Sequence, residues 1–282
     1  MRTKKGVQIT LNIIALIVVL LIFLPIIIML PSMFKGVREI FSYPWHLFPR
    51  NITFDNFRYL AYLEYTTMAI NYFTALFMTI LVASLAVLLS LLINMVAAFA
   101  FARLRFPGKR ILWAFILFTM FIPGITILIT SIRVVSFLKM LNTIWVLVIP
   151  GLVSAYNMFF FRQFYLNFPK DLDEAAKIDG ASIFQIFTQI YFPMSFTPMV
   201  IIGASIFMGY YNSYVWPSLV IDQNHKQLFQ IMTAIYKLFC DSSELGYGVV
   251  LAGAFVAMIP PMIIFVIVQK YIRDGIQLSG TK

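Results

Sequence analysis

The chain has 282 residues, of which 61% are hydrophobic and only 11% are charged, and its formal net charge is +10. A soluble domain carries about a quarter charged residues, so this composition excludes an ordinary water-soluble globular protein. The sequence contains no P-loop, nucleophile-elbow or zinc-protease pattern. Neither His46 nor His225 has a further metal ligand at suitable spacing. We therefore expect a membrane protein with no catalytic residue, bound cofactor or metal site of its own.

Six apolar stretches are long enough to cross the membrane as helices, because about 20 residues cover roughly 30 Å of hydrocarbon. The stretches are continuous rather than alternating with a period of two, which favours helices over a barrel. The first is too long for the core of a signal peptide, and we expect it to be an uncleaved span. The sequence predicts one all-α membrane domain, residues 1–282. Its expected spans are Thr10–Met33, Tyr72–Ala100, Ile111–Ile132, Leu141–Phe161, Thr197–Leu219 and Val249–Tyr271.

The distribution of Lys and Arg predicts the orientation, because cytoplasmic loops carry an excess of both. With the N-terminus inside, the inner segments hold 13 basic residues and the outer segments hold 8. The strongest contribution comes from Arg103–Arg110, with four cations in eight residues. Both termini are therefore predicted to be cytoplasmic. Topology and anionic lipid account for the net charge, so no nucleic-acid partner is expected.

The expected spans contain almost no Asp, Glu, Arg or His. Ion-driven carriers use such residues inside the bilayer as a proton or ion relay. Any uphill transport would therefore draw its energy from a partner protein. A self-contained channel or secondary carrier is the alternative, and it would transport its solute without ATP.

The inner loop 162–195 is predicted to form an elbow of two short helices between the fourth and fifth spans. Asp171 can cap the first helix, and Glu174 three residues later completes a capping box. Gly180 lies where a left-handed residue ends a helix. Ser182 opens a second capping box, so both helices have their own start signal.

Within the first helix, Asp173 and Lys177 are expected to pair at i, i+4. Small alanines allow another backbone to approach closely, and the isoleucines and phenylalanines of the second helix offer apolar anchors. The elbow is therefore interpreted as a docking site for another protein; an amphipathic elbow resting on the membrane surface is the alternative. The candidate docking residues are Asp171, Glu174, Ala175, Ala176, Asp179, Gly180, Ile183, Phe184 and Phe187.

The run Glu174-Ala-Ala-Lys-Ile-Asp-Gly180, followed by Ile190-Tyr-Phe-Pro193, resembles the EAA loop of permease subunits in bacterial ABC importers. Five further stretches resemble the carbohydrate-uptake, maltose-type branch of these permeases, so the resemblance covers most of residues 71–282. These stretches are residues 99–108, 141–145, 161–163, 269–271 and 275–280.

The resemblance implies a six-span permease in the bacterial plasma membrane that works by alternating access. It implies a second permease chain, with which a heterodimer is expected. It also implies two ATPase subunits that dock on the elbow and hold ATP and Mg, and an extracytoplasmic solute-binding protein. The implied solute is a sugar or oligosaccharide, and a non-sugar solute is the alternative.

Aromatic and amide side chains in the outer half of the fifth span are candidates for the solute pathway, because they offer both an apolar face and hydrogen bonds. An aromatic belt at the outer interface is the alternative. The candidates are Tyr211, Asn212, Tyr214 and Trp216, with Tyr156 and Asn157 of the fourth span as weaker ones. Pro123-Gly124, Pro150-Gly151 and Pro260-Pro261 interrupt three spans and can form breaks there.

Two outer segments are also unusual. Segment 34–71 is too aromatic for a solvated linker, and segment 220–248 is predicted to contain a helix over Leu228–Phe239. The resemblance implies that these segments meet the solute-binding protein, and packing within the chain is the alternative.

Overall fold

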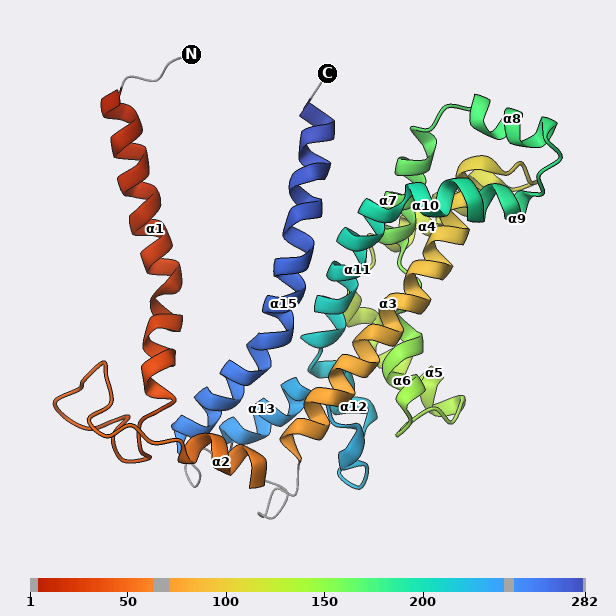
Figure 1. Cartoon of the computed structure of the whole chain (residues 1–282). Coiled ribbons are helices and arrows are strands. Elements are labelled where there is room, and N and C mark those ends of the chain that lie inside the picture. The colour runs from red at the N-terminus through yellow and green to blue at the C-terminus, as the bar shows by residue number, and fades with distance from the viewer. Residues whose placement is uncertain (1–4, 63–70, 241–245, 281–282) are drawn as a thin grey trace. The chain divides into compact units, whose positions relative to one another are not determined.

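The computed structural model describes residues 5–62, 71–240 and 246–280, and every regular element in these ranges is a helix (Figure 1). The all-α prediction is therefore confirmed. The main helices are α1 (Lys5–Ser32), α2 (Asp55–Tyr62), α3 (Tyr72–Arg103), α4 (Lys109–Thr119), α5 (Gly124–Phe137), α6 (Ile144–Val148), η2 (Ile149–Gly151), α7 (Ala155–Leu166), α8 (Asp171–Ile178), α9 (Ile183–Ile186), η3 (Phe187–Tyr191), α10 (Phe192–Met194), α11 (Phe196–Tyr211), α12 (Val215–Val220), η4 (Lys226–Leu228), α13 (Ile231–Cys240) and α15 (Tyr247–Gly280).

Three helices, α1, α3 and α15, contain apolar segments long enough to cross a membrane unbroken. Three bent helix pairs raise the number of possible spans to six among the described residues. Residues 6–25 of α1 are all exposed, as expected for an apolar helix that faces lipid or another membrane helix. The prolines Pro260 and Pro261 lie inside α15 without ending it.

The third expected span, Ile111–Ile132, is broken rather than continuous. Helices α4 and α5 meet at an angle of 104°. Pro123 precedes α5 with an extended backbone, φ −60° and ψ 130°. A proline lacks the N–H that would continue the helix and disfavours helical geometry in the residue before it, so the break falls here.

The fourth and fifth expected spans also differ from the prediction. The fourth begins at Ile144 because Lys139 and Asn142 adopt left-handed backbone conformations, and it bends by 48° between η2 and α7. In the fifth, helix α11 stops at Tyr211, and residues 215–219 belong to the separate helix α12. No continuous helix therefore runs over the expected spans Leu141–Phe161 and Thr197–Leu219.

The chain folds into two compact units. The first comprises residues 1–72 and 234–258, and the second comprises residues 73–233 and 259–282. In the first unit, the buried Asn56 donates hydrogen bonds to the carbonyls of Met33 (2.7 Å) and Lys35 (2.9 Å). The segment after α1 is thus fastened to α2.

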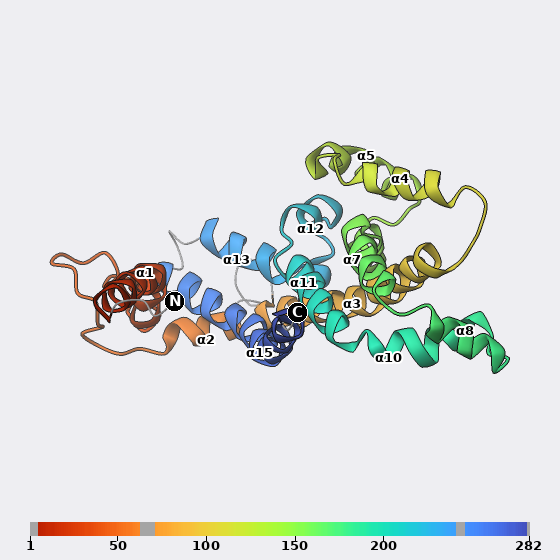
Figure 2. The same cartoon turned by 90° about the horizontal axis from the view of Figure 1, so that it is seen from above.

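The second unit has an aromatic core where the C-terminal ends of α3 and α7 meet η3. Tyr165 and Tyr191 pack edge to face at 5.3 Å, and Phe99 lies 4.9 Å from Tyr191. Helix α4 lies beside α7 in both views (Figures 1 and 2), where the guanidinium of Arg162 stacks on Trp113 at 4.5 Å. This core carries the elbow.

Candidate functional site

The elbow consists of α8 and α9, joined through Gly180, at the end of the second unit where α3 and α7 finish (Figure 1). Gly180 has φ +79°, so the predicted left-handed end of the first helix is confirmed. The second capping box is also confirmed. The Gln185 N–H donates to Ser182 Oγ at 3.3 Å, and the Ser182 N–H donates to Gln185 Oε1 at 2.8 Å.

The first predicted capping box is absent. Lys170 occupies the cap position and makes no side-chain cap bond; its carbonyl accepts from the N–H groups of Asp173 and Glu174. The helix therefore starts one residue earlier than the capping rule suggests. Asp171 lies within the first turn, where its charge favours the positive end of the helix dipole.

The predicted Asp173–Lys177 pair is replaced by a tertiary contact. The Asp173 carboxylate lies 3.7 Å from Arg103 Nε, and it accepts a 2.7 Å hydrogen bond from the Tyr191 hydroxyl. The two charged side chains are only 7% and 14% exposed. A partly buried carboxylate gains more from a buried cation than from a solvated lysine, which explains the choice of partner.

Arg103 connects the elbow to two helix ends at once. Its Nη2 donates to the carbonyls of Tyr165 (2.8 Å) and Phe168 (2.7 Å), and its guanidinium lies over the Tyr191 ring at 5.3 Å. The last turns of α3 and α7 and the first turn of α8 are therefore joined through one side chain.

The exposed surface of the elbow combines apolar side chains with acidic ones. Phe184 is 74% exposed and Ile183 is 54% exposed. Asp171, Glu174, Ala175, Asp179 and Gly180 are also exposed. Ile178 is 86% exposed and was not among the predicted docking residues. An apolar residue in the last turn of an otherwise polar helix is the sequence signal for it.

Two predicted docking residues face inward. Phe187 is buried, and its ring packs at 5.3 Å from that of Phe99. Ala176 is half-buried against the same core. Both positions hold the elbow in place and offer little surface to a partner.

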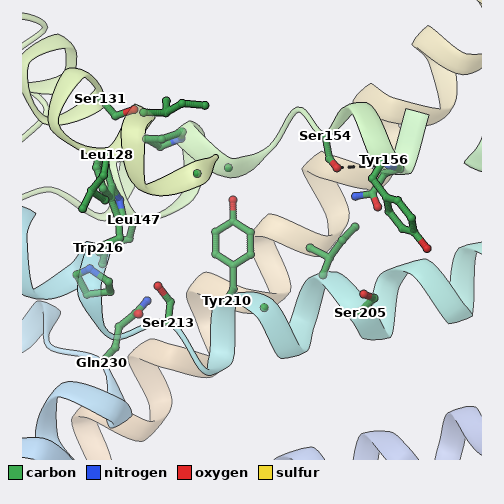
Figure 3. A pocket seen from close by; sticks show the side chains of 18 residues that line it. Leu128, Ser131, Leu147, Ser154, Tyr156, Ser205, Tyr210, Ser213, Trp216 and Gln230 are labelled. Carbon is green, nitrogen blue, oxygen red and sulfur yellow. Dashed lines mark hydrogen bonds between the residues drawn. The ribbon is translucent and has the colours of Figure 1, made fainter. Parts of the chain in front are cut away.

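A cavity of about 530 Å³ lies in the second unit between the broken helices (Figure 3). This volume falls in the range of about 300–1,000 Å³ typical of small-molecule sites. Serines, aromatic residues and amides supply its polar surface. The lining consists of Gly124, Ile127, Leu128, Ser131, Leu147, Pro150, Gly151, Ser154, Tyr156, Asn157, Ser205, Ile206, Gly209, Tyr210, Ser213, Trp216, Pro217 and Gln230.

Three of the six predicted solute-pathway residues line this cavity, namely Tyr156, Asn157 and Trp216. The other three do not belong to the lining: Tyr211 is buried, Asn212 is exposed at the end of α11, and Tyr214 is half-buried. Adjacent helical residues point about 100° apart, so it is Tyr210 that lines the cavity. From the predicted segment of the fifth span, Tyr210 and Trp216 therefore line the cavity, and Tyr211, Asn212 and Tyr214 do not.

Side chains from other helices hold the carbonyls of the broken fourth span. The Tyr210 hydroxyl donates to the Val148 carbonyl and the Trp216 indole N–H donates to the Val146 carbonyl, each at 2.8 Å. The break exposes backbone groups that must find partners inside a membrane. These two aromatic residues therefore stabilise one wall of the cavity.

A second set of hydrogen bonds to the broken fourth span comes from α3. The buried Asn94 Nδ2 donates to the Leu152 carbonyl at 2.8 Å, and its Oδ1 accepts from the Ser154 N–H at 3.0 Å. Ser90 Oγ donates to the same Leu152 carbonyl at 2.7 Å. The gap between η2 and α7 is thus a fixed feature of the cavity rather than a loose linker.

Gly151→Ala should disturb the cavity wall, because the added Cβ would overlap the Tyr210 hydroxyl. We expect a loss of about 1–3 kcal/mol of stability, typical of overpacking. A lowered midpoint of thermal unfolding in detergent would measure it. Gly209→Ala is the matched control, since nothing lies within 4 Å of its added Cβ. Equal midpoints for both variants would contradict the close Gly151–Tyr210 contact.

No cluster of three or more His, Cys, Asp or Glu side chains suited to a metal ion occurs among the described residues. None of the residues that line the cavity is Asp, Glu, Lys, Arg or His. The polar groups of the cavity wall are therefore all neutral.

The chain is similar to known proteins along most of its length. Residues 94–277 match the family described as binding-protein-dependent transport system inner membrane component. The chain is 27% identical over 248 residues to an arabinooligosaccharides transport system permease protein of Halalkalibacterium halodurans, covering 88% of this chain and 84% of that protein. It is 27% identical over 271 residues to a polygalacturonan/rhamnogalacturonan transport system permease protein of Bacillus subtilis, covering 92% of each.

The same fold occurs in a solved bacterial ABC transporter involved in the import of the acidic polysaccharide alginate. The TM-score is 0.81 at 22% identity, covering 96% of this chain and 98% of that chain.

Apolar helices, broken spans around an uncharged cavity and a compact elbow at one end define the membrane-spanning subunit of a transporter. The family match covers about two thirds of the chain. The chain belongs to the family of inner membrane components of binding-protein-dependent transport systems. The resemblance to ABC-importer permeases seen in the EAA-type run is therefore confirmed.

Proposed function

We propose that this chain is the permease subunit of an ATP-driven importer for a sugar or oligosaccharide, and that the elbow receives an ATPase subunit. The observation that carries the docking role is the exposure of Ile178, Ile183 and Phe184 on a segment fastened to α3 by Arg103. A soluble face would seldom present three large apolar side chains together, whereas a partner groove can bury them. ATP and Mg would be held by the ATPase, on a separate chain.

The charges support a cytoplasmic position for the elbow. Arg103 contacts Asp173 directly, so the basic run from Arg103 to Arg110 lies at the same end of the second unit as α8. Clustered Lys and Arg favour the cytoplasmic side. We therefore place the elbow on the inner face of a bacterial plasma membrane. The cytoplasmic position of the termini rests on the distribution of Lys and Arg along the sequence.

The outer partners follow from exposed apolar surface in the first unit. Phe41 and Phe48 are 73% and 71% exposed, and Tyr43 is 99% exposed. Aromatic side chains of this kind are enriched in protein interfaces. We assign this surface to a solute-binding protein, and the exposed faces of the membrane helices to lipid and a second permease chain in a heterodimer.

The cavity supports a sugar as the solute, because it combines aromatic residues with hydroxyl and amide groups. Two of the relatives are named as permeases for arabinooligosaccharides and for polygalacturonan or rhamnogalacturonan, which are carbohydrates. Alternating access would open this cavity to one side of the membrane at a time. ATPase closure, acting through the elbow, would drive the change.

Glu174→Lys should abolish ATP-dependent uptake, because it reverses an exposed charge on the first helix of the elbow. We expect a loss of ATPase co-purification while the chain stays inserted in the membrane. Uptake into proteoliposomes and pull-down of the ATPase measure both effects. Arg133→Glu is the control, since it reverses an exposed charge outside the elbow. Normal pull-down and uptake by Glu174→Lys would remove the docking role.

A further inference from the structure

Gln230 is a buried amide with unused hydrogen-bonding capacity. Its side chain is 1% exposed, yet it lines the cavity. Its Oε1 is buried and has no hydrogen-bond partner. Buried polar atoms are nearly always paired, so an unpaired acceptor beside a cavity is a candidate to pair with a ligand. That ligand must bring a donor, an O–H or an N–H.

Figure 3 shows Gln230, Ser213 and Trp216 toward one side of the cavity, with Tyr210 between them and Ser205 and Tyr156 on the other. The Trp216 indole N–H is already used by the Val146 carbonyl, which leaves its ring face for an apolar contact. The hydroxyls of Ser205 and Ser213 form no side-chain hydrogen bond within the described chain. This side of the cavity therefore combines the Gln230 acceptor, the Ser213 hydroxyl and the Trp216 ring face.

The cavity contains no charge to balance a charged ligand. A carboxylate or phosphate leaving water needs a cation or several charge-assisted hydrogen bonds, and the lining has no Lys, Arg or His. A cationic ligand would likewise find no Asp or Glu among the lining residues. A neutral ligand rich in hydroxyl groups does not have to bury an uncompensated charge of either sign.

We propose that this chain itself holds a solute subsite for a neutral, hydroxyl-rich ring, and that a hydroxyl of the solute donates to Gln230 Oε1. The inference rests on the proposed function, because it names the solute class for the permease. It separates this chain's solute by charge from the acidic polysaccharide imported by the alginate transporter of the same fold, and from the polygalacturonan, also acidic, for which the Bacillus subtilis relative is named. Gln230 would then be a specificity-determining residue that neither the sequence pattern nor the family match points out.

The test is equilibrium dialysis of the complete transporter in lipid nanodiscs, without its solute-binding protein. The probes are the neutral trisaccharides arabinotriose and maltotriose and the anionic trigalacturonate. We expect at least one neutral probe to bind, and trigalacturonate to bind at least about tenfold more weakly. No binding of either neutral probe, or tighter binding of trigalacturonate, would overturn the inference.

Gln230→Leu separates a binding role from a packing role. Removing an unpaired buried acceptor should raise the unfolding midpoint while neutral-probe binding falls at least about tenfold. Gln227→Leu, an exposed glutamine three residues earlier, should change neither. A lowered midpoint with unchanged binding would make Gln230 a packing residue. If ATP-dependent uptake by the wild type persists in that case, only the subsite fails; if the wild type shows no such uptake, the proposed function itself fails.

Discussion

Arg103→Leu is expected to abolish uptake while the chain remains inserted and the rest of the second unit stays folded. Arg103 is the side chain that joins the ends of α3 and α7 to Asp173 of α8. Removing one member of a buried pair leaves the other charge uncompensated, which costs about 3–5 kcal/mol. The loss weakens the contact that holds α8 against the ends of α3 and α7. Movement of a docked ATPase would then no longer reach α3.

Two measurements check this expectation. Uptake into proteoliposomes should be lost, and limited proteolysis should cut between α7 and α8 faster than in the wild type. Arg105→Leu is a matched control, because Arg105 is exposed two residues away and forms no ion pair among the described residues. Wild-type proteolysis and uptake by Arg103→Leu would show that the elbow is held by other contacts.

A double variant sharpens the argument. Replacing both partners of a buried pair by apolar residues removes the uncompensated charge, so Arg103→Leu combined with Asp173→Leu should be more stable than Arg103→Leu alone. Uptake should remain low in the double variant, because the connection itself is still missing. The comparison would thereby separate the effect on the stability of the protein from the effect on the connection between the elbow and α3.

The sequence predicted the long helices and the elbow because their signals are local. Apolar length places α1 and α3 within a few residues of their observed ends. The capping box at Ser182 and the left-handed Gly180 depend on neighbours within four residues. These features need no knowledge of the rest of the fold.

Features that depend on distant residues escaped prediction. Asp173 lies four residues before Lys177, but its carboxylate pairs with Arg103, 70 positions away. The break after η2 is held by Asn94, whose bond to Ser154 spans 60 positions. Gln230 belongs to a segment expected outside the membrane, and only the tertiary fold buries it against the cavity. No local pattern encodes these pairings.

Gly180→Pro is expected to abolish uptake by reshaping the elbow. The backbone of Gly180 has φ +79°, and proline is fixed near −65°, so α8 and α9 cannot keep their angle. Nothing lies within 4 Å of a Cβ built at Gly180. A side chain at position 180 is therefore disfavoured by the left-handed backbone conformation and not by a lack of space. The expected effect is loss of ATPase pull-down together with uptake.

A graded series at this position isolates the cause. Asparagine tolerates the left-handed region better than other non-glycine residues, so Gly180→Asn should retain most uptake. Gly180→Ala should lie between the two, with a backbone cost of about 1–2 kcal/mol per residue in that region. The order asparagine, alanine, proline in ATPase pull-down is the required result. If alanine and asparagine both fail as completely as proline, a direct contact of the partner with the glycine backbone governs docking instead of the angle between the helices.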